Sequence, residues 1–409
     1  MPADKILAQE KSHHEPEVHK LRFVKIQGYR PFKDFTAELD LLEVFVGANG
    51  TGKSSFFEFL KFIRDGVKTE EIPAEIIAGS IGQQIFHKPG PDKFFWNLEM
   101  NMEGEKTAIQ YQGELIGPVG QTRVIYETVQ TAKPLGQQYS KPLILMDVRN
   151  GSGKIFDPLL KKFKSQEIIL KRTNQLALSL MTNPALKTLY DLREFILEWK
   201  FYNSFNIDNY KIRQAVPTEQ EPILREDAGN LSSVLHYLMT EHPPIFDELQ
   251  QYLRQVIPGF KKLMVKARGA PGHVIAFWQE EGGEDLSLAD LSNGTLHLIC
   301  WTALCVNPKI PTLICIDEPD QGVHPRTLPF LAGLFKKASE RTQIFLATHA
   351  SYFLIQFDLE NLAVLVKENG ETKFVKPANS AILKENLKEF GSEEIEIMHK
   401  NDELENFSE

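Results

Sequence analysis

The stretch Gly47-Ala-Asn-Gly-Thr-Gly-Lys-Ser54 decides how the rest of the chain is interpreted. It has a glycine, four free positions and then Gly-Lys-Ser, which is the pattern of the phosphate-binding P-loop. Its glycines allow successive backbone N–H groups to turn toward an anion, and the N-terminus of the following helix adds its dipole. We therefore predict that this loop binds a nucleoside triphosphate, with Lys53 reaching the outer phosphates and Ser54 coordinating Mg²⁺. The predicted nucleotide-binding set of the loop is Gly47, Asn49, Gly50, Gly52, Lys53, Ser54 and Ser55.

The residues on both sides of the loop have the patterns of a buried strand and an amphipathic helix. Residues 44–46 form a short apolar run, and residues 54–64 place aromatic and aliphatic side chains on one helical stripe. Gly66 follows this stripe and is predicted to end the helix. A strand, a glycine-rich loop and a helix in this order are the context that a P-loop requires.

Composition is typical of a globular protein. The chain has 409 residues, of which 42% are hydrophobic and 25% charged. No apolar run is long enough to predict a segment that spans a membrane, so no membrane partner is predicted. Its three cysteines lie in apolar runs without a Cys-x-x-Cys spacing, which indicates reduced core residues and a cytoplasmic protein. Residues 1–19 are polar, and their three histidines fit either a solvated leader, which is the favoured interpretation, or a metal site.

The net charge of −9 argues against a general nucleic-acid binder, but the charge is uneven. Residues 151–270 hold 17 Lys and Arg against 13 Asp and Glu. The basic clusters at 161–164 and 261–268 fit either contacts with a DNA backbone or solvated surface positions, and the second interpretation is favoured.

The patterns along the chain divide it into five segments. After the leader, residues 20–150 hold the P-loop and the alternating strands of a small antiparallel meander at 94–102, 107–112 and 123–129. Residues 151–264 have mainly helical patterns that prolines interrupt, so a mostly helical insertion is predicted. Residues 265–385 alternate between helices and apolar strands in the α/β manner, and residues 386–409 form an acidic tail.

The stretch Asn150-Gly-Ser-Gly-Lys154 resembles a second P-loop only superficially. Its lysine is followed by Ile155, and Val148 stands where the first glycine of the pattern belongs. Asn-Gly favours the turn of a β-hairpin. We predict a turn here that does not bind phosphate.

The stretch Leu313-Ile-Cys-Ile-Asp-Glu-Pro319 carries the second strong pattern. Four apolar residues predict a buried strand, and two acids follow at its carboxyl end, where ligands bind in open α/β sheets. Asp317 is predicted to hold Mg²⁺, and Glu318 is predicted to be the catalytic group that polarises the attacking water. A bound cation explains why two acids stand together at the end of a buried strand.

Three further stretches resemble motifs of ABC-type ATPases. Leu291-Ser-Asn-Gly-Thr295 resembles the Leu-Ser-x-Gly signature at the start of a helix, and Asp320-Gln-Gly-Val-His-Pro325 stands where that class has its D-loop. Thr348-His349 follows an apolar strand, where the class has its switch histidine. The resemblance implies that Ser292 and Gly294 bind the γ-phosphate of a nucleotide held by the other subunit. It also implies a catalytic role for His349 in sensing that phosphate.

Together these motifs resemble the RecF/OLD/SMC-like branch of ABC-type ATPases. Residues 21–32 are similar to the opening strand and turn of that branch, and Arg30 occupies an arginine position that approaches the nucleotide in some relatives. Gln83 and Gln84 both fit the spacing of the Q-loop glutamine, and Gln84 is the candidate metal-contacting residue. The resemblance implies an α/β P-loop NTPase with an ABC-type ATPase head, a mixed or parallel sheet with helices and an antiparallel β-meander. Neither coiled-coil arms nor a Toprim nuclease module is predicted.

The function predicted from these residues is hydrolysis of ATP, with ATP and Mg²⁺ as cofactors. The resemblance implies a homodimer that closes around ATP and gates a separate effector protein, in a setting such as phage defence. The alternative is a repair or recombination ATPase that clamps DNA through the weakly basic insertion. A transporter subunit is disfavoured by the long separation of Lys53 from Ser292, and a GTPase by the lack of an Asn-Lys-x-Asp motif.

Overall fold

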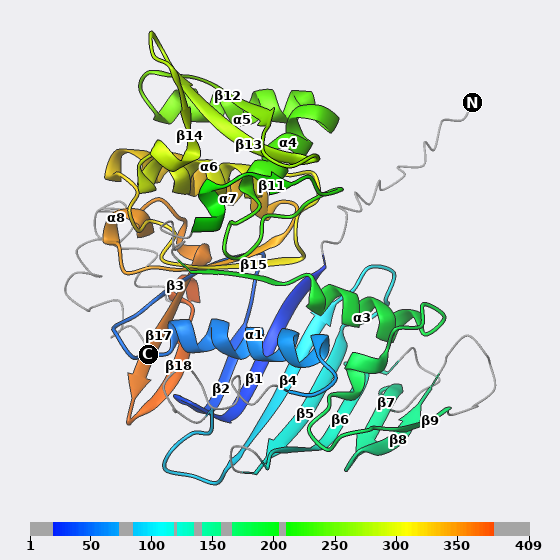
Figure 1. Cartoon of the computed structure of the whole chain (residues 1–409). Coiled ribbons are helices and arrows are strands. Elements are labelled where there is room, and N and C mark those ends of the chain that lie inside the picture. Colours follow the sequence, from blue (N-terminus) through cyan, green and yellow to red (C-terminus); the bar gives the residue numbers. More distant parts are fainter. Residues whose placement is uncertain are drawn as a thin grey trace, which may run out of the picture.

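A computed structural model of the chain describes residues 19–72, 85–117, 121–134, 141–156, 166–203 and 210–379. Within these ranges the strands form three sheets of eight, six and four strands. Figure 1 shows the eight-stranded sheet and helix α1 (Lys53–Lys68) in one half of the molecule, and the small sheet with helices α4 to α7 in the other half. The six-stranded sheet contributes side chains to the apolar cores of both halves.

The six-stranded sheet is parallel except for its last strand. Its strands, in spatial order, are β10 (Lys200–Asn203), β15 (Leu313–Asp317), β16 (Gln343–Ala347), β3 (Leu42–Val46), β17 (Leu362–Glu368) and β18 (Glu371–Val375). Alternate residues of β3 face opposite cores, with Phe45 in one and Val44 and Val46 in the other. Both faces of the sheet are therefore buried, which explains why its central strands are continuous apolar runs. The parallel order also brings the carboxyl ends of β3, β15 and β16 to one edge.

The eight-stranded sheet is an antiparallel extension of the predicted meander. Its order is β2 (Phe32–Glu38), β1 (Lys20–Tyr29), β4 (Lys93–Asn101), β5 (Ile109–Ile116), β6 (Arg123–Thr131), β7 (Ile144–Arg149), β8 (Ser152–Ile155) and β9 (Gln166–Ile169). Helix α1 shares the apolar core of this sheet. Asn150 and Gly151 form the turn between β7 and β8 with φ angles of 47° and 83°, so the predicted hairpin is confirmed.

Helix α1 does not end at Gly66, contrary to the sequence prediction. It continues to Lys68, and Gly66 lies on its buried side. A Cβ atom at this glycine would stand only 2.8 Å from Cδ1 of Leu176, in the segment before the 3-10 helix η2 (Ala177–Leu180). The glycine therefore serves close packing between two elements, which a single helical pattern does not reveal.

The segment at 151–264 contains the predicted helices and also short strands that join the two larger sheets. Its helices are α3 (Lys187–Leu197), α4 (Leu231–Glu241) and α5 (Pro243–Val256), with η3 (Tyr210–Arg213) between them. However, β8 and β9 extend the eight-stranded sheet, and β10 pairs in parallel with β15. The predicted boundary at 150/151 falls within the β7–β8 hairpin, and the one at 264/265 falls within β12 (Phe260–Ala267). Strands of four residues are too short for their alternation to be recognised.

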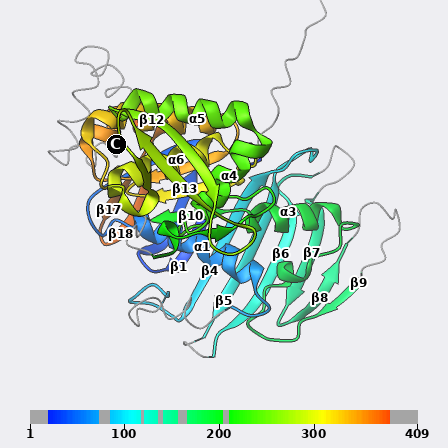
Figure 2. The same cartoon turned by 45° about the horizontal axis from the view of Figure 1, so that its top comes forward.

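The small sheet leads directly into the signature segment. Its strands β11 (Val216–Pro217), β13 (His273–Glu280) and β12 pair in this order, and β14 (Asp285–Ser287) pairs with β13. It packs against α4 and α5 (Figure 2). The chain then forms η4 (Leu288–Asp290), α6 (Asn293–Val306), η5 (Pro325–Thr327), α7 (Leu328–Ser339), α8 (Ser351–Leu354), η6 (Leu359–Asn361) and η7 (Pro377–Asn379). Among the described helices, none has the length and apolar character to cross a membrane.

Candidate functional site

The loop between β3 and α1 requires glycine at two of its positions. Gly47 has a φ of 145°, and a Cβ atom there would stand 2.3 Å from the carbonyl oxygen of Leu365. Gly52, at the N-cap of α1, has a φ of 110° and lies against the ring of Phe32. Both positions combine a positive φ with a close approach, so any other residue would be strained there. Asn49 and Gly50 lie exposed at the outer rim, and Ser55 is half-buried in the first turn of α1.

Lys53 is held at the mouth of this loop. Its side chain is only 5% exposed, and its Nζ atom donates hydrogen bonds to the carbonyl oxygens of Gly47 at 2.5 Å and Ala48 at 3.1 Å. The ammonium therefore folds back over the backbone that is predicted to surround the phosphates. A fixed charge in this place attracts an anion without a large rearrangement of the chain.

The structure brings the P-loop serine and the β15 aspartate into direct contact. The hydroxyl group of Ser54 donates a hydrogen bond of 2.7 Å to Oδ2 of Asp317, although the two residues are 263 positions apart. Two oxygen donors this close fit the oxygen preference of Mg²⁺, which usually keeps waters and phosphate oxygens as its remaining ligands. Within the described ranges, no group of three or more His, Cys, Asp or Glu side chains is placed to hold a metal. The donor set therefore fits an ion that a bound nucleotide helps to hold.

Glu318 follows Asp317 in a strained backbone conformation. Its φ of 54° lies in the left-handed region, which is uncommon for a residue with a side chain. Its backbone N–H donates a hydrogen bond of 2.8 Å to the carbonyl oxygen of Ala347 at the end of β16. Strained backbone conformations of this kind cluster at functional sites, where the surrounding structure holds them. Here the conformation of Glu318 turns the chain sharply after β15.

His349 lies at the same edge of the sheet, after β16. Partial desolvation lowers the pKa of its imidazole, and the nearby Lys53 ammonium lowers that pKa further. Three carboxylates act on the pKa in the opposite direction, and they belong to Glu318, Asp317 and Asp320. A pKa below 6.5 leaves the imidazole mainly neutral at pH 7, and the imidazole lies close enough to these groups for their charges to act on it.

The signature segment contacts the D-loop of its own chain. Ser292 is the exposed N-cap of α6, and its Oγ accepts a hydrogen bond from the backbone N–H of Thr295 at 3.2 Å. A Cβ atom at Gly294 would stand 2.5 Å from the carbonyl oxygen of Gly322, so the two backbones touch. Ser292 and Asn293 are exposed, so the first turn of α6 lies at the surface of the chain.

Arg30 is engaged by a residue that the sequence did not single out. It forms an ion pair with Glu58 on α1, and its φ is 43°. The next two residues, Pro31 and Phe32, lie against Gly52. The turn therefore lies beside the P-loop, and the guanidinium group is directed to Glu58. Nothing in the pattern of residues 54–64 distinguishes Glu58 from a solvated helix position.

A second unpredicted contact joins the switch segment to the D-loop. The buried hydroxyl group of Thr348 donates a hydrogen bond of 2.6 Å to Oδ1 of Asp320 and accepts one of 3.0 Å from the N–H of Ala350. The adjacent motifs contain both residues, so the sequence indicated the region but not the pair. Gln83, Gln84 and the lysines at 161, 162 and 164 lie outside the described residues.

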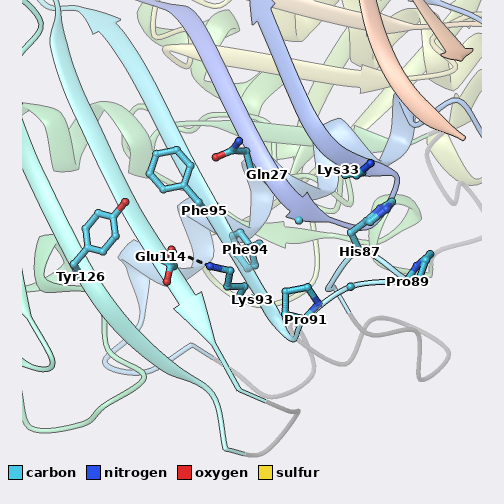
Figure 3. A pocket seen from close by; sticks show the side chains of 12 residues that line it. Gln27, Lys33, His87, Pro89, Pro91, Lys93, Phe94, Phe95, Glu114 and Tyr126 are labelled. Carbon is cyan, nitrogen blue, oxygen red and sulfur yellow. Dashed lines mark ion pairs between the residues drawn. The ribbon is translucent and has the colours of Figure 1, made fainter. Parts of the chain in front are cut away.

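The opposite face of the eight-stranded sheet carries a cavity of about 550 Å³ (Figure 3). Its walls include Gln27, Lys93, Phe95 and Tyr126, whose side chains lie on the face of the sheet away from α1. The cavity is therefore separate from the P-loop edge. One residue links the two places, because Nδ1 of His87 in the cavity wall is 2.7 Å from the carbonyl oxygen of Arg30.

The parallel sheet, the P-loop with its serine–aspartate contact and the signature helix define a P-loop ATPase with an ABC-type head. Sequence comparison agrees, since the family described as "AAA ATPase domain" matches residues 20–241. A second family, described as "AAA domain, putative AbiEii toxin, Type IV TA system", matches residues 149–355. The chain therefore belongs to the AAA-family ATPases, and the predicted family resemblance is confirmed. No curated protein matches the chain significantly.

Solved structures similar to this chain include heads of SMC proteins. The Smc head bound to the C-terminal winged-helix domain of ScpA is 13% identical, with a TM-score of 0.55 over 87% of this chain and 97% of that one. The Smc head domain with an extended coiled coil, bound to the C-terminal domain of ScpA from Pyrococcus furiosus, is 12% identical. Its TM-score is 0.54 over 91% of this chain and 100% of that one. At this identity the likeness confirms the fold, which is the predicted ABC-type head.

Proposed function

We propose that the chain hydrolyses ATP in a Mg²⁺-dependent reaction at the edge where β3, β15 and β16 end. The observation that carries this proposal is the 2.7 Å contact between Ser54 and Asp317, which joins the phosphate-binding loop to the acidic end of β15. Glu318 and His349 lie at the same edge. When bound, Mg²⁺ would be held by Ser54 and Asp317 and would neutralise charge on the outer phosphates.

Different residues of this chain bind the phosphates, accept the proton and sense the γ-phosphate. Lys53 and the N-terminus of α1 hold the phosphates, and Glu318 accepts a proton from the attacking water. The water oxygen bonds to the γ-phosphorus while the bond from that phosphorus to the β–γ bridging oxygen breaks, which leaves ADP and phosphate. The neutral imidazole of His349 donates a hydrogen bond to a γ-phosphate oxygen and loses that contact when phosphate leaves.

The signature residues support a dimer of this chain. Ser292 is exposed and Gly294 lies against the D-loop, so the N-terminus of α6 is presented to a ligand brought by another molecule. In the proposed dimer each ATP lies between Lys53 of one copy and Ser292 of the other. Hydrolysis removes the bridging phosphate and opens the dimer.

The E318Q variant tests both the catalytic role and the dimer. Replacement of the carboxylate by an amide removes the base but leaves the P-loop, so ATP should bind and the dimer should accumulate. Light scattering should show the mass of two chains with ATP and Mg²⁺, and the mass of one chain without them. If the variant binds ATP and its mass does not change, the dimer mechanism is wrong.

The movement of such a dimer would act on a separate effector protein in the cytoplasm. The family description that names a putative toxin of a toxin–antitoxin system supports a role beside a partner in defence. Co-purification of the E318Q variant with ATP should retain that partner. The same preparation with ADP should release it.

DNA binding is the second candidate, and the surface of β12 favours it. Lys261, Lys262 and Arg268 are exposed, and residues 251–270 contain five basic residues and no acidic ones. Reversal of charge in the double variant K261E/K262E should weaken DNA binding and reduce its dependence on salt. No binding by the unmodified chain at low salt would remove this candidate.

A further inference from the structure

The D-loop lies between the P-loop edge and the signature in each chain. On one side, Asp320 accepts the hydrogen bond from Thr348 at 2.6 Å, beside the switch histidine. On the other side, the carbonyl oxygen of Gly322 lies against Gly294 of the signature. The order along this surface is therefore the P-loop, then the D-loop with the switch segment, and then the signature.

This order fixes what meets at the centre of the proposed dimer. The inference rests on the proposed function, in which the P-loop of each copy meets the signature of the other. In a two-fold interface the order along one surface is reversed on the partner, so the middle of the surface lies opposite itself. The D-loop and the switch segment must therefore lie closest to the two-fold axis.

Among the described residues, Tyr352 is the exposed large apolar residue nearest in sequence to the switch segment. It lies on α8, three residues after His349, and its side chain is 59% exposed while the next residue, Phe353, is fully buried. Figure 1 shows α8 at the outer edge of the half that contains α6 and α7. Among the described residues, the other exposed large apolar side chains are Ile144, Ile169 and Leu180, which lie in the half that contains the eight-stranded sheet.

A single exposed tyrosine is not unusual in itself. This one, however, lies only three residues after the switch histidine. Tyrosine is enriched at the centres of interfaces, because it buries a large ring with few rotatable bonds and can still make a hydrogen bond. We propose that Tyr352 is an anchor of the interface between two copies of this chain, and that the two Tyr352 side chains pack beside the two-fold axis of the ATP-bound dimer.

Cross-linking of the full-length chain tests this position directly. The native cysteines Cys300, Cys305 and Cys315 are buried, so an introduced surface cysteine is the one that reacts. The double variant E318Q/Y352C, treated with a short bis-maleimide, should form a covalent dimer with ATP and Mg²⁺ and none without ATP. The matched control E318Q/I169C carries its cysteine on β9 at an apolar position that is 77% exposed, and it should not cross-link.

Dimer affinity provides the second measurement. Each dimer contains two copies of the side chain, so E318Q/Y352A should raise the dissociation constant of the ATP-bound dimer by on the order of tenfold or more. The single variant Y352A should have lowered ATPase activity at low protein concentration. Its activity should approach that of the unmodified chain at high concentration, where the dimer forms again. A defect in chemistry would not depend on protein concentration.

The outcomes separate this inference from the proposed function. If E318Q forms an ATP-dependent dimer, but Tyr352→Cys does not cross-link and Tyr352→Ala leaves the affinity unchanged, the inference about Tyr352 is wrong and the dimer stands. If E318Q binds ATP and stays monomeric, the proposed function itself fails.

Discussion

The P-loop edge and the signature edge of this ATPase are built in different ways. At the P-loop edge, Lys53 is buried and bonded to its own loop, and Ser54 is bonded to Asp317. At the signature edge, Ser292 is exposed and its hydroxyl group is bonded to Thr295 in the first turn of the same helix. The first edge is assembled within one chain, whereas the second is displayed outward. This difference is expected when one chain supplies the two halves of the site to different nucleotides.

The variant K53A should have the largest effect, because it removes the charge at the centre of the assembled edge. We expect ATP binding to be lost and turnover to fall by at least about 10²-fold, the usual result of removing a preorganised charge. Fluorescent ATP binding and phosphate release measure the two effects. The control is K61A, since Lys61 is an exposed lysine of the same helix. Wild-type ATP affinity in K53A would mean that the loop does not bind phosphates as proposed.

Substitution at the signature edge should lower turnover without removing ATP binding. In S292D the aspartate can still cap α6, but its charge repels the γ-phosphate of a nucleotide brought by the partner. We expect ATP binding by the variant's own P-loop to remain and turnover to fall by on the order of tenfold or more. The S292N variant keeps the helix cap without the charge, so its turnover should fall less than that of S292D. If S292D also lost ATP binding by the monomer, the two edges would belong to one site within a single chain.

Mixing the two inactive variants tests the comparison most directly. A heterodimer of K53A and S292D has one site with both defects and one site with neither. If subunits exchange freely, about half of the dimers are mixed and each has one intact site, so activity should return to about a quarter of that of the unmodified chain. Titration of S292D into a fixed amount of K53A with an ATPase assay measures this. The absence of recovery, with subunit exchange verified, would exclude a site shared between chains.

The motifs allowed the assembled edge to be predicted because each one is continuous in the sequence. The glycines before Ser54 and the apolar run before Asp317 define strand, loop and strand end, and parallel strands place those ends together. The ion pair between Arg30 and Glu58 could not be predicted, because it depends on how a turn lies against a helix. No local pattern records such a contact.

The errors in the fold have a related cause. Gly66 was predicted to end a helix because glycine is a frequent stop signal, whereas its position is set by the packing of Leu176 from a distant segment. The four residues of β10 become a strand because β15 provides hydrogen-bond partners, not because their own pattern requires it. Tertiary contacts decide short elements that propensity leaves undetermined.

The smallest effect we predict concerns a buried carboxylate of the eight-stranded sheet. Glu127 on β6 is fully buried and accepts hydrogen bonds from the Tyr111 hydroxyl group and from the backbone N–H groups of Ala177 and Leu178. It therefore fixes η2, whose preceding residue Leu176 packs on α1 at Gly66. Burial raises the pKa of this carboxyl group from an ordinary value of 4.5 to about 7.

The sign of the pH dependence follows from that shift. The folded chain binds this proton more tightly than the unfolded chain, so the stabilisation is complete below pH 4.5 and is lost as the pH rises through 7. The loss amounts to roughly 3 kcal/mol of the free energy of unfolding. Burial also raises the pKa of Glu43 to about 7, so Glu43 contributes to the pH dependence of stability in the same pH range. The E127Q variant should therefore remove only part of that dependence. Urea unfolding between pH 5 and 8 measures this, with E99Q on the same sheet as the control. If E127Q and the unmodified chain lost stability in parallel, Glu127 would not titrate in the folded protein, and its hydrogen bonds would hold η2 in the same way at every pH.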